Sequence, residues 1–290
     1  MTTPDNNIKY VVIGDPVAHS LSPEMQNAGF EASGLGSPYG KIRVTLEDFP
    51  AFVAFAREQL LGFNITVPHK QTILPYLNSI SHEAGLAQSV NTVTVKNGKL
   101  HGESTDGYGL ETALKEAFGL NVKDGRFFFI GCGGAVQAVA FHFASRGAKS
   151  LCFANRNQDK VSLLVEQLTQ AYPAVESTCC GLSDLPTLKR FIENSEVAIQ
   201  GTSLGLKPED PPPIPLEMLK NICCYETIYK PTPFLKYAQQ AGLKTADGRT
   251  MLLHQGAKSF ELWTGKTANV EAMRQALYTA IARQQGGEKS

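Results

Sequence analysis

The sequence predicts an α/β protein with two domains. At 290 residues the chain is long enough for two domains of ordinary size, each with its own hydrophobic core. Short apolar runs alternate with helix-like stretches, which is the rhythm of βαβ units. A glycine-rich turn at 131–135 directly follows one of these runs, a pattern typical of a Rossmann-type parallel sheet.

The first series of strands lies before residue 100. A helix is expected at 47–60, between runs of apolar and β-branched residues that predict strands at 10–16, 41–44, 63–67 and 91–95. Asn97 and Gly98 follow the last of these runs, and both residue types tolerate the positive φ of a type I′ turn. We therefore expect a hairpin there.

A second series of strands begins at 126 and predicts a parallel sheet. Its members are the apolar runs at 126–131, 150–155, 176–181, 196–201 and 222–229, with helical patterns between them. The proline-rich stretch 207–215 reads as a surface connection. After 248 the periodicity is helical to the end, and it places four residues on nearby turns of one helix: Leu252, Gln255, Ser259 and Leu262.

Composition narrows the class of protein. Lys plus Arg equals Asp plus Glu at 27 each, so no basic field is present to hold a nucleic acid or an anionic membrane. The N-terminal ten residues lack a basic segment followed by an apolar core, and no apolar run approaches the roughly 20 residues of a membrane span. We expect a cytoplasmic protein. The six cysteines have no spacing that suits zinc, so no metal is expected.

The glycine-rich turn predicts a dinucleotide site. A pyrophosphate must approach the backbone at a helix N-terminus, where the N–H groups and the helix dipole favour negative charge and Cβ atoms would obstruct it. The residues expected to make this approach are Gly131, Gly133, Gly134 and Ala135. A plain tight turn is the alternative, and the position between a strand and a helix favours the cofactor.

The end of the next strand favours NADP over NAD. An NAD site usually offers a carboxylate about 20 residues further on, for the ribose hydroxyls. This chain has Asn155, Arg156 and, one helical turn later, Lys160 in that region. Arg156 presents a planar cation suited to a phosphate, although a solvated surface arginine is the alternative.

Lys70 is a further candidate because it follows the apolar run FNITV at the tip of a predicted strand. Nearly the whole chain resembles the shikimate dehydrogenase family, through seven short motifs that occur in the family's order: HSLSP (19–23), FNITVPHK (63–70), NT (91–92), STDGYG (104–109), GCGGAVQA (131–138), NRN (155–157) and QGAKSFELWTG (255–265). The resemblance implies reversible reduction of 3-dehydroshikimate to shikimate with NADPH, in aromatic amino acid biosynthesis.

The resemblance also implies a domain plan. An N-terminal α/β domain holds the substrate. It consists of residues 1–108 together with 248–290, because the C-terminal helices return to the first domain. The Rossmann-type domain, 109–247, holds NADP. Members of the family occur as monomers and homodimers.

Carried over by position, the resemblance makes Lys70 and Asp106 the catalytic pair. Hydride delivery to a ketone leaves negative charge on oxygen, which a nearby ammonium can stabilise or protonate, and a carboxylate can orient that ammonium. Whether Lys70 donates the proton or mainly polarises the carbonyl stays open.

The resemblance implies further site residues. Ser20 and Ser22 match the pair that grips the substrate carboxylate, and Ser22 before Pro23 also suits a helix start. The positions that contact the ring hydroxyls in the family are matched here by Asn64, Thr66, Asn91 and Gln255. Tyr229 matches a tyrosine at the domain cleft. The nicotinamide is expected near Thr202 and Leu206. His69 and His101 match no catalytic position and are expected to be structural.

Several positions depart from the family pattern. They are Gln137 for a frequent arginine, Asn157 for a commoner threonine, Gln200 for asparagine, Leu206 for methionine, Glu226 for aspartate, and a shorter loop near Lys230. These departures indicate a divergent branch. Two alternatives therefore stay open, a quinate/shikimate dehydrogenase that uses NAD or both cofactors, and a non-catalytic ligand-binding paralogue.

Overall fold

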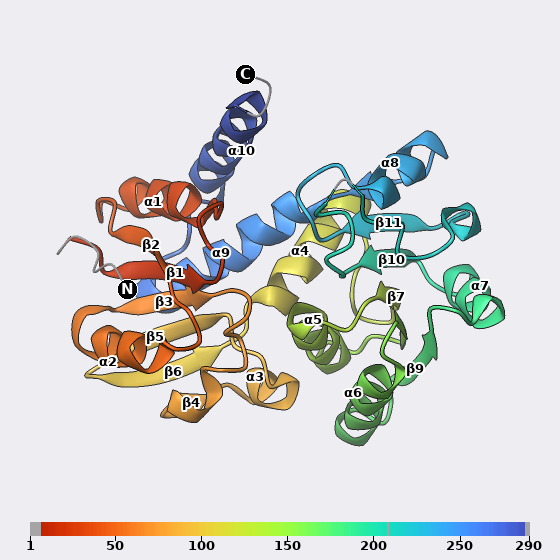
Figure 1. The fold of residues 1–290 in the computed structure, drawn as a ribbon, viewed down its shortest axis with the longest axis horizontal. Coiled ribbons are helices and arrows are strands. Elements are labelled where there is room, and N and C mark those ends of the chain that lie inside the picture. Colours follow the sequence, from red (N-terminus) through yellow and green to blue (C-terminus); the bar gives the residue numbers. More distant parts are fainter. Residues whose placement is uncertain (1–6, 208, 288–290) are drawn as a thin grey trace. The chain divides into compact units, whose positions relative to one another are not determined.

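The structure is a computed structural model that describes residues 7–207 and 209–287. The expected cytoplasmic location was based partly on the N-terminal ten residues, and the first six of these lie outside the described part. Residue 208 in the proline-rich loop also lies outside it. The chain divides into two units, with Met1–Gly109 and Leu253–Ser290 in the first and Leu110–Leu252 in the second. Figure 1 traces their helices and strands in the colours of the sequence.

The first unit contains a mixed six-stranded sheet with the order β2-β1-β3-β5-β6-β4. Its strands are β1 (Tyr10–Gly14), β2 (Tyr39–Arg43), β3 (Gly62–Ile65), β4 (Ser79–Ile80), β5 (Thr92–Lys96) and β6 (Lys99–Glu103). β1 is parallel to β2 and β3, whereas β5 is antiparallel to both β3 and β6. As a result, the start of β5 and the ends of β1, β3 and β6 meet at one edge of this sheet.

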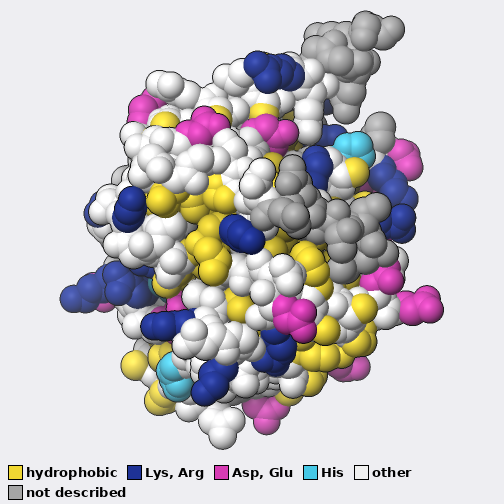
Figure 2. Space-filling model, turned by 90° about the vertical axis from the view of Figure 1, so that its left-hand side faces the viewer, with side chains coloured by type: hydrophobic (Ala, Val, Ile, Leu, Met, Phe, Trp, Pro, Cys, Tyr) yellow, Lys and Arg dark blue, Asp and Glu magenta, His cyan; other side chains and the backbone are white. Residues whose placement is uncertain are grey.

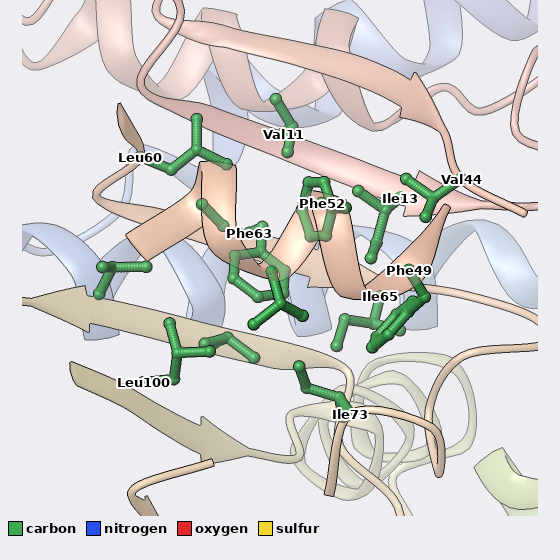
Figure 3. Close-up of a cluster of buried hydrophobic side chains, with 14 of the residues drawn as sticks. Val11, Ile13, Val44, Phe49, Phe52, Leu60, Phe63, Ile65, Ile73 and Leu100 are labelled. Carbon is green, nitrogen blue, oxygen red and sulfur yellow. The ribbon is translucent and has the colours of Figure 1, made fainter. Parts of the chain in front are cut away.

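The first unit also contains helices. They are α1 (Ser22–Ala32), α2 (Phe49–Gln59), η1 (Leu74–Tyr76), α3 (His82–Ala87), the start of α4 (Asp106–Phe118), most of α9 (Gly248–Thr264) and α10 (Val270–Gly287). In Figure 3, Phe52 of α2 meets Ile13 of β1 and Phe63 of β3 in a cluster of fully buried side chains. At about 25 cal/mol per Å² of apolar surface, such clusters are the main source of stability.

The second unit contains a parallel sheet with the order β12-β11-β10-β7-β8-β9. Its strands are β7 (Arg126–Ile130), β8 (Ser150–Asn155), β9 (Glu176–Gly181), β10 (Val197–Gln200), β11 (Cys223–Glu226) and β12 (Thr245–Ala246). The helices between them are α5 (Gly134–Ser145), α6 (Gln158–Ala171), α7 (Leu185–Glu193), η2 (Leu216–Met218) and α8 (Pro233–Gln240). The order reverses between β7 and β10, and doubly wound sheets bind ligands at such a switch point.

The expected α/β fold is confirmed, with small differences at the ends of the elements. Asn97 and Gly98 have φ values of 52° and 72°, as the type I′ hairpin turn requires. The chain after 248 is helical, as expected, and it forms two helices, because α9 ends at Thr264 and Gly265 has a φ of 67°. A left-handed glycine is a common way to end a helix. α10 then packs against α1, so the C-terminal helices do return to the first unit.

Charged side chains of both signs are interspersed on the face drawn in Figure 2, in keeping with the equal numbers of basic and acidic residues. Within the described ranges, none of the helices combines the length and the apolar character that crossing a bilayer requires.

Candidate functional site

Lys70 lies just beyond β3, in a turn that neighbouring segments hold in place. The carbonyl oxygen of Lys70 accepts a hydrogen bond from the Val90 N–H at 2.9 Å. Three residues earlier, the Val67 carbonyl accepts from the Asp15 N–H at 2.9 Å, which joins this turn to the loop after β1. Backbone bonds to two different segments therefore fix where the Lys70 side chain begins.

The side chains of Lys70 and Asp106 form an ion pair. Nζ of Lys70 lies 2.5 Å from Oδ2 of Asp106, and the two side chains are 17% and 7% exposed. Asp106 is the first residue of α4, where the helix dipole favours a negative charge. The structure thus brings together the two residues that the resemblance pairs, although they stand 36 positions apart in the chain.

Asn91 holds the Asp106 carboxylate from its other side. Its Nδ2 donates to Oδ1 of Asp106 and to the Thr105 hydroxyl, both at 2.9 Å, and lies 3.3 Å from Oε1 of Gln255. Its Oδ1 accepts from the Thr105 N–H at 2.8 Å and from the Thr92 hydroxyl at 2.9 Å. The fully bonded amide keeps the carboxylate and Gln255 of α9 in a single arrangement.

Asn64 extends this network away from Lys70. Its Oδ1 accepts from the Tyr39 hydroxyl at 2.7 Å, and its Nδ2 donates to Ser259 Oγ at 3.0 Å and to the Asn91 carbonyl at 3.1 Å. The Tyr39 side chain is buried, and burial raises its pKa well above the ordinary range, so the phenol stays protonated and able to donate. Ser259 closes the network through its contact with the Thr92 hydroxyl at 2.8 Å.

Sequence reasoning assigned no role to four members of this network: Tyr39, Thr92, Thr105 and Ser259. The sequence does contain a signal for one of them, Ser259. Ser259 follows Gln255 by one helical turn and was expected on the same helix, so both residues should face the same neighbours. Ser259 also donates to the Gln255 carbonyl at 3.0 Å, a common way for a serine to be satisfied within a helix.

The two serines expected to grip a carboxylate lie at the start of α1. The helix begins at Ser22, as the Ser-Pro pair indicated, and the Ser22 N–H donates to Ser20 Oγ at 3.3 Å. One turn later, Gln26 is fully buried and its Nε2 donates to the Gly256 carbonyl at 2.9 Å. This bond ties α1 to the part of α9 that follows Gln255.

Thr66 lies between β3 and Lys70, and its N–H donates to the Ile13 carbonyl at 2.9 Å. A Cβ atom built on Gly14 would lie 2.4 Å from Cγ2 of Thr66, so glycine at 14 makes room for this side chain. The loops after β1 and β3 are therefore packed against each other beside the Lys70 turn.

The two histidines make structural contacts. His69 is fully buried, with Nε2 2.6 Å from the Val44 carbonyl oxygen and its ring 4.8 Å from that of Phe49. His101 lies on β6, where Nδ1 is 2.8 Å from the Ser79 hydroxyl and Nε2 is 3.3 Å from Glu103. These contacts agree with the structural roles expected for both.

The glycine-rich turn in the second unit fits a dinucleotide pyrophosphate. Gly131 has a φ of 106°, and a Cβ atom built on it would lie 2.8 Å from Cγ2 of Thr202. Gly133 is exposed at the N-cap of α5, where no side chain bonds to the first turn, and a Cβ built on it would meet its nearest neighbour only at 4.0 Å. Gly134 and Ala135 then open the helix. The helix N-terminus is thus accessible to an anion.

The loop after β8 lies beside this turn, because β7 and β8 are paired. Asn155 Nδ2 donates to the Asn157 carbonyl at 2.8 Å, and Asn157 Oδ1 caps α6 by accepting from the Lys160 N–H at 2.9 Å. This capping role of Asn157 was not predicted, although asparagine before a helix is a recognised signal. Arg156 is exposed between the two asparagines, where its guanidinium can reach a phosphate.

The loop after β10 carries the two residues expected near the nicotinamide. The Thr202 N–H donates to Oε1 of Gln200 at 2.6 Å, and the Thr202 hydroxyl accepts from the Leu204 N–H at 3.1 Å. Leu206 is 56% exposed. Gln137, which replaces a frequent arginine, points its Nε2 back toward the Cys132 carbonyl at 3.5 Å. Tyr229 also belongs to the second unit, in the loop after β11, and burial raises its pKa.

Comparisons with known proteins agree with this organisation. Residues 12–93 match the shikimate dehydrogenase substrate binding domain, 112–205 match shikimate / quinate 5-dehydrogenase, and 248–278 match the shikimate 5'-dehydrogenase C-terminal domain. A shikimate dehydrogenase (NADP(+)) from Desulfitobacterium hafniense is 39% identical over 277 residues, which cover 94% of this chain and 98% of that protein.

Solved structures give the same result. The shikimate 5-dehydrogenase of Listeria monocytogenes, in complex with shikimate and NAD, has a TM-score of 0.86 and 31% identity, covering 96% of this chain and 99% of that one. The enzyme of Thermus thermophilus, in complex with NADP(H) and shikimate, has a TM-score of 0.83 and 32% identity, covering 94% and 99%. This chain belongs to the shikimate dehydrogenase family.

Proposed function

We propose that this protein is an NADP-dependent shikimate dehydrogenase, which reversibly reduces 3-dehydroshikimate to shikimate. The observation that carries the proposal is the partly buried Lys70–Asp106 pair, held by Asn91 at an edge of the sheet where amide and hydroxyl groups converge. The relatives at 35–39% identity over most of the chain bear the name of this activity. We further infer a role in aromatic amino acid biosynthesis, in the cytoplasm, as a monomer or homodimer.

Lys70 is the catalytic cation in this proposal. NADPH, when bound, supplies the hydride that reduces the ketone. As negative charge develops on the carbonyl oxygen, the Lys70 ammonium stabilises it through a charged hydrogen bond and is placed to give up a proton. Asp106 keeps the ammonium oriented, and Asn91 keeps Asp106 oriented, so little reorganisation is needed during the reaction.

Neutral polar groups suit the rest of the substrate. Shikimate carries a carboxylate and ring hydroxyls, and amides and hydroxyls can donate to and accept from such groups without demanding a counter-charge. The proposed contacts to the hydroxyls are Asn64, Thr66, Asn91 and Gln255, and those to the carboxylate are Ser20 and Ser22, with Tyr229 completing the set. Asn64, Asn91 and Gln255 are joined by the hydrogen bonds described above.

Arg156 is the group that favours NADP in this proposal. It is exposed beside the glycine-rich turn, and no carboxylate stands at the end of β8 to take the ribose hydroxyls of NAD. A phosphate on that ribose would meet the guanidinium and Lys160 instead.

A quinate/shikimate dehydrogenase that also uses NAD is the second candidate. One feature favours it, because Gln137 folds toward Cys132 where a second arginine would otherwise add to the phosphate site. The relative from Listeria monocytogenes was also solved with NAD. A weaker phosphate site would reduce the preference for NADP without removing the dehydrogenase activity.

One assay separates these functions. Purified protein is mixed with shikimate or quinate and with NADP or NAD, and the absorbance of the reduced cofactor is followed. We expect the fastest growth with shikimate and NADP. Comparable rates with quinate or NAD would identify the second candidate, and silence in all four mixtures would leave only a ligand-binding paralogue.

A further inference from the structure

A second buried acidic residue lies at the end of β11, within the second unit. Glu226 is fully buried, and each of its carboxyl oxygens has a partner. Oε1 accepts from the Ile228 N–H at 3.0 Å, and Oε2 accepts from the Thr232 hydroxyl at 2.6 Å. Thr232 also caps α8 by accepting from the Leu235 N–H at 3.2 Å. Glu226 therefore draws both ends of its loop, including the start of α8, onto the end of the strand.

The same threonine packs against the loop that follows β10. Gly205 in that loop has a φ of 103°, and a Cβ atom built on it would lie 2.7 Å from Cγ2 of Thr232. Only glycine accommodates both this conformation and this approach. The bond between Glu226 and Thr232 therefore also sets the surface on which the β10 loop rests.

Backbone and amide bonds join the two loops a second time. The Thr227 N–H donates to the Gln200 carbonyl at 3.0 Å, next to the paired residues Gln200 and Glu226. The Gln200 side chain in turn spans its own loop, donating to the Leu204 carbonyl at 2.9 Å and accepting from the Thr202 N–H at 2.6 Å. The two loops thus share one buried set of hydrogen bonds.

We propose that Glu226 is a positioning residue for the reaction: its buried carboxyl group locks the loop that carries Tyr229 to the loop that carries Thr202 and Leu206. The proposal rests on the proposed function, because these three residues are the expected contacts to substrate and cofactor. Glu226 acts through the loops and makes no such contact of its own.

Burial gives this lock a dependence on pH. Burial raises the pKa of Glu226 to about 7, and the like charge of Asp247 acts in the same direction, while the bonds from Thr232, Ile228 and Thr227 oppose the rise. Asp247 lies before α9 and is paired with Arg249 at 2.8 Å.

The sign of this dependence follows from linkage. The buried state favours the neutral carboxyl group, so ionisation above about pH 7 favours a loop in which the carboxylate reaches water. Two lysines lie in this part of the chain, Lys230 on the loop and Lys236 on α8, and both are exposed. The two loops are therefore held together most firmly below neutral pH, and less firmly as pH rises and Glu226 ionises.

Two substitutions test the lock. Glu226→Ala removes the hydrogen bonds from Ile228 and Thr232, and Glu226→Gln keeps a neutral group of the same shape. KM for shikimate and kcat are measured with saturating NADP between about pH 6 and about pH 9. In Glu226→Ala we expect KM to rise about tenfold with kcat within about twofold, since misplaced loops weaken binding more than chemistry. In the wild type KM should rise above about pH 7, whereas Glu226→Gln should lack that rise.

Glu196→Gln is the matched control. Glu196 also accepts a backbone N–H, that of Arg126 at 2.9 Å, but it stands at the opposite end of β10 from the loops. Its substitution should leave the wild-type pH profile unchanged. The proposal is overturned if Glu226→Gln retains the wild-type rise in KM, or if a folded Glu226→Ala has the wild-type KM throughout. If Glu226→Ala does not fold, the Glu226→Gln profile decides alone.

A measurement without substrate keeps this test separate from that of the proposed function. Hydrogen exchange of the backbone amides of residues 227–230 and of Thr232 is followed in the wild type and in Glu226→Gln over the same pH range, and rates are corrected for the intrinsic effect of pH. Protection should fall above about pH 7 in the wild type only. If the two proteins show equal protection, the proposed role of Glu226 is refuted, even if the protein has no activity with shikimate. If the exchange is as expected but the protein has no activity, only the proposed dehydrogenase function is refuted.

Discussion

Asp106 uses both of its carboxylate oxygens to hold two different partners: Oδ2 lies 2.5 Å from Lys70 Nζ, and Oδ1 accepts from Asn91 Nδ2 at 2.9 Å. A carboxylate bound on both sides cannot rotate freely. The ammonium paired with it is therefore held in one place before substrate arrives. This arrangement separates the roles of the three residues, and each role can be tested by itself.

Replacing Lys70 by alanine should lower kcat at least about 100-fold and leave KM for shikimate nearly unchanged, because the ammonium acts mainly on charge that develops in the transition state. Initial rates over a range of shikimate concentrations give both constants. Lys96→Ala, which removes an exposed lysine of β5, is the control and should match the wild type. A large rise in KM with kcat intact would instead identify Lys70 as a binding residue.

Replacing Asn91 by alanine should destabilise the first unit by about 2–4 kcal/mol, because the buried N–H of Thr105 loses its partner and the hydroxyls of Thr92 and Thr105 each lose one of theirs. Denaturant unfolding measures the change. Asn78→Ala serves as the control, since Asn78 also accepts a backbone N–H, that of Leu100 at 2.9 Å, but is exposed to water. Similar losses for both variants would contradict a special role for the Asn91 network.

Replacing Arg156 by alanine should raise KM for NADP at least about tenfold while KM for NAD changes little, because only NADP carries the phosphate that the guanidinium would bind. Arg146→Ala is the matched control, since Arg146 is an exposed arginine of the same unit that pairs with Glu111 at 3.5 Å. Equal losses for the two cofactors would show that Arg156 does not read the phosphate.

Local patterns in the sequence predicted much of the fold. The strands expected at 150–155 and 176–181 have those bounds in the structure, because turn-forming residues lie at or near the ends of both segments, Gly147 and Asn157 for the first and Pro173 and Gly181 for the second. The hairpin at Asn97 was readable for the same reason. By contrast, β12 has only two residues, too few to display any alternation, and β4 is equally short.

The site was predictable only in part. Lys70 stood out at the tip of a strand, but its pairing with Asp106 came from the family resemblance, since nothing local links residues so far apart. The bond between Asn64 and Ser259 joins positions 195 apart, and that between Trp263 Nε1 and the Val93 carbonyl joins positions 170 apart. Such contacts depend on how the sheet and α9 pack, and the hydrophobic periodicity within the strands or within α9 does not predict them.

Glu226→Gln should change how stability depends on pH. The folded protein raises the pKa of this carboxyl group from 4.5 to about 7, so its contribution to stability is fully present below about pH 4.5 and is lost as pH rises through about 7. The loss is of order 3 kcal/mol, from 1.36 kcal/mol per pKa unit. Glutamine does not titrate, so the variant should gain stability relative to the wild type between about pH 5 and about pH 8. Urea unfolding at both values measures the gain, with Glu196→Gln as the control. A constant difference between the two proteins would mean that Glu226 titrates in its ordinary range.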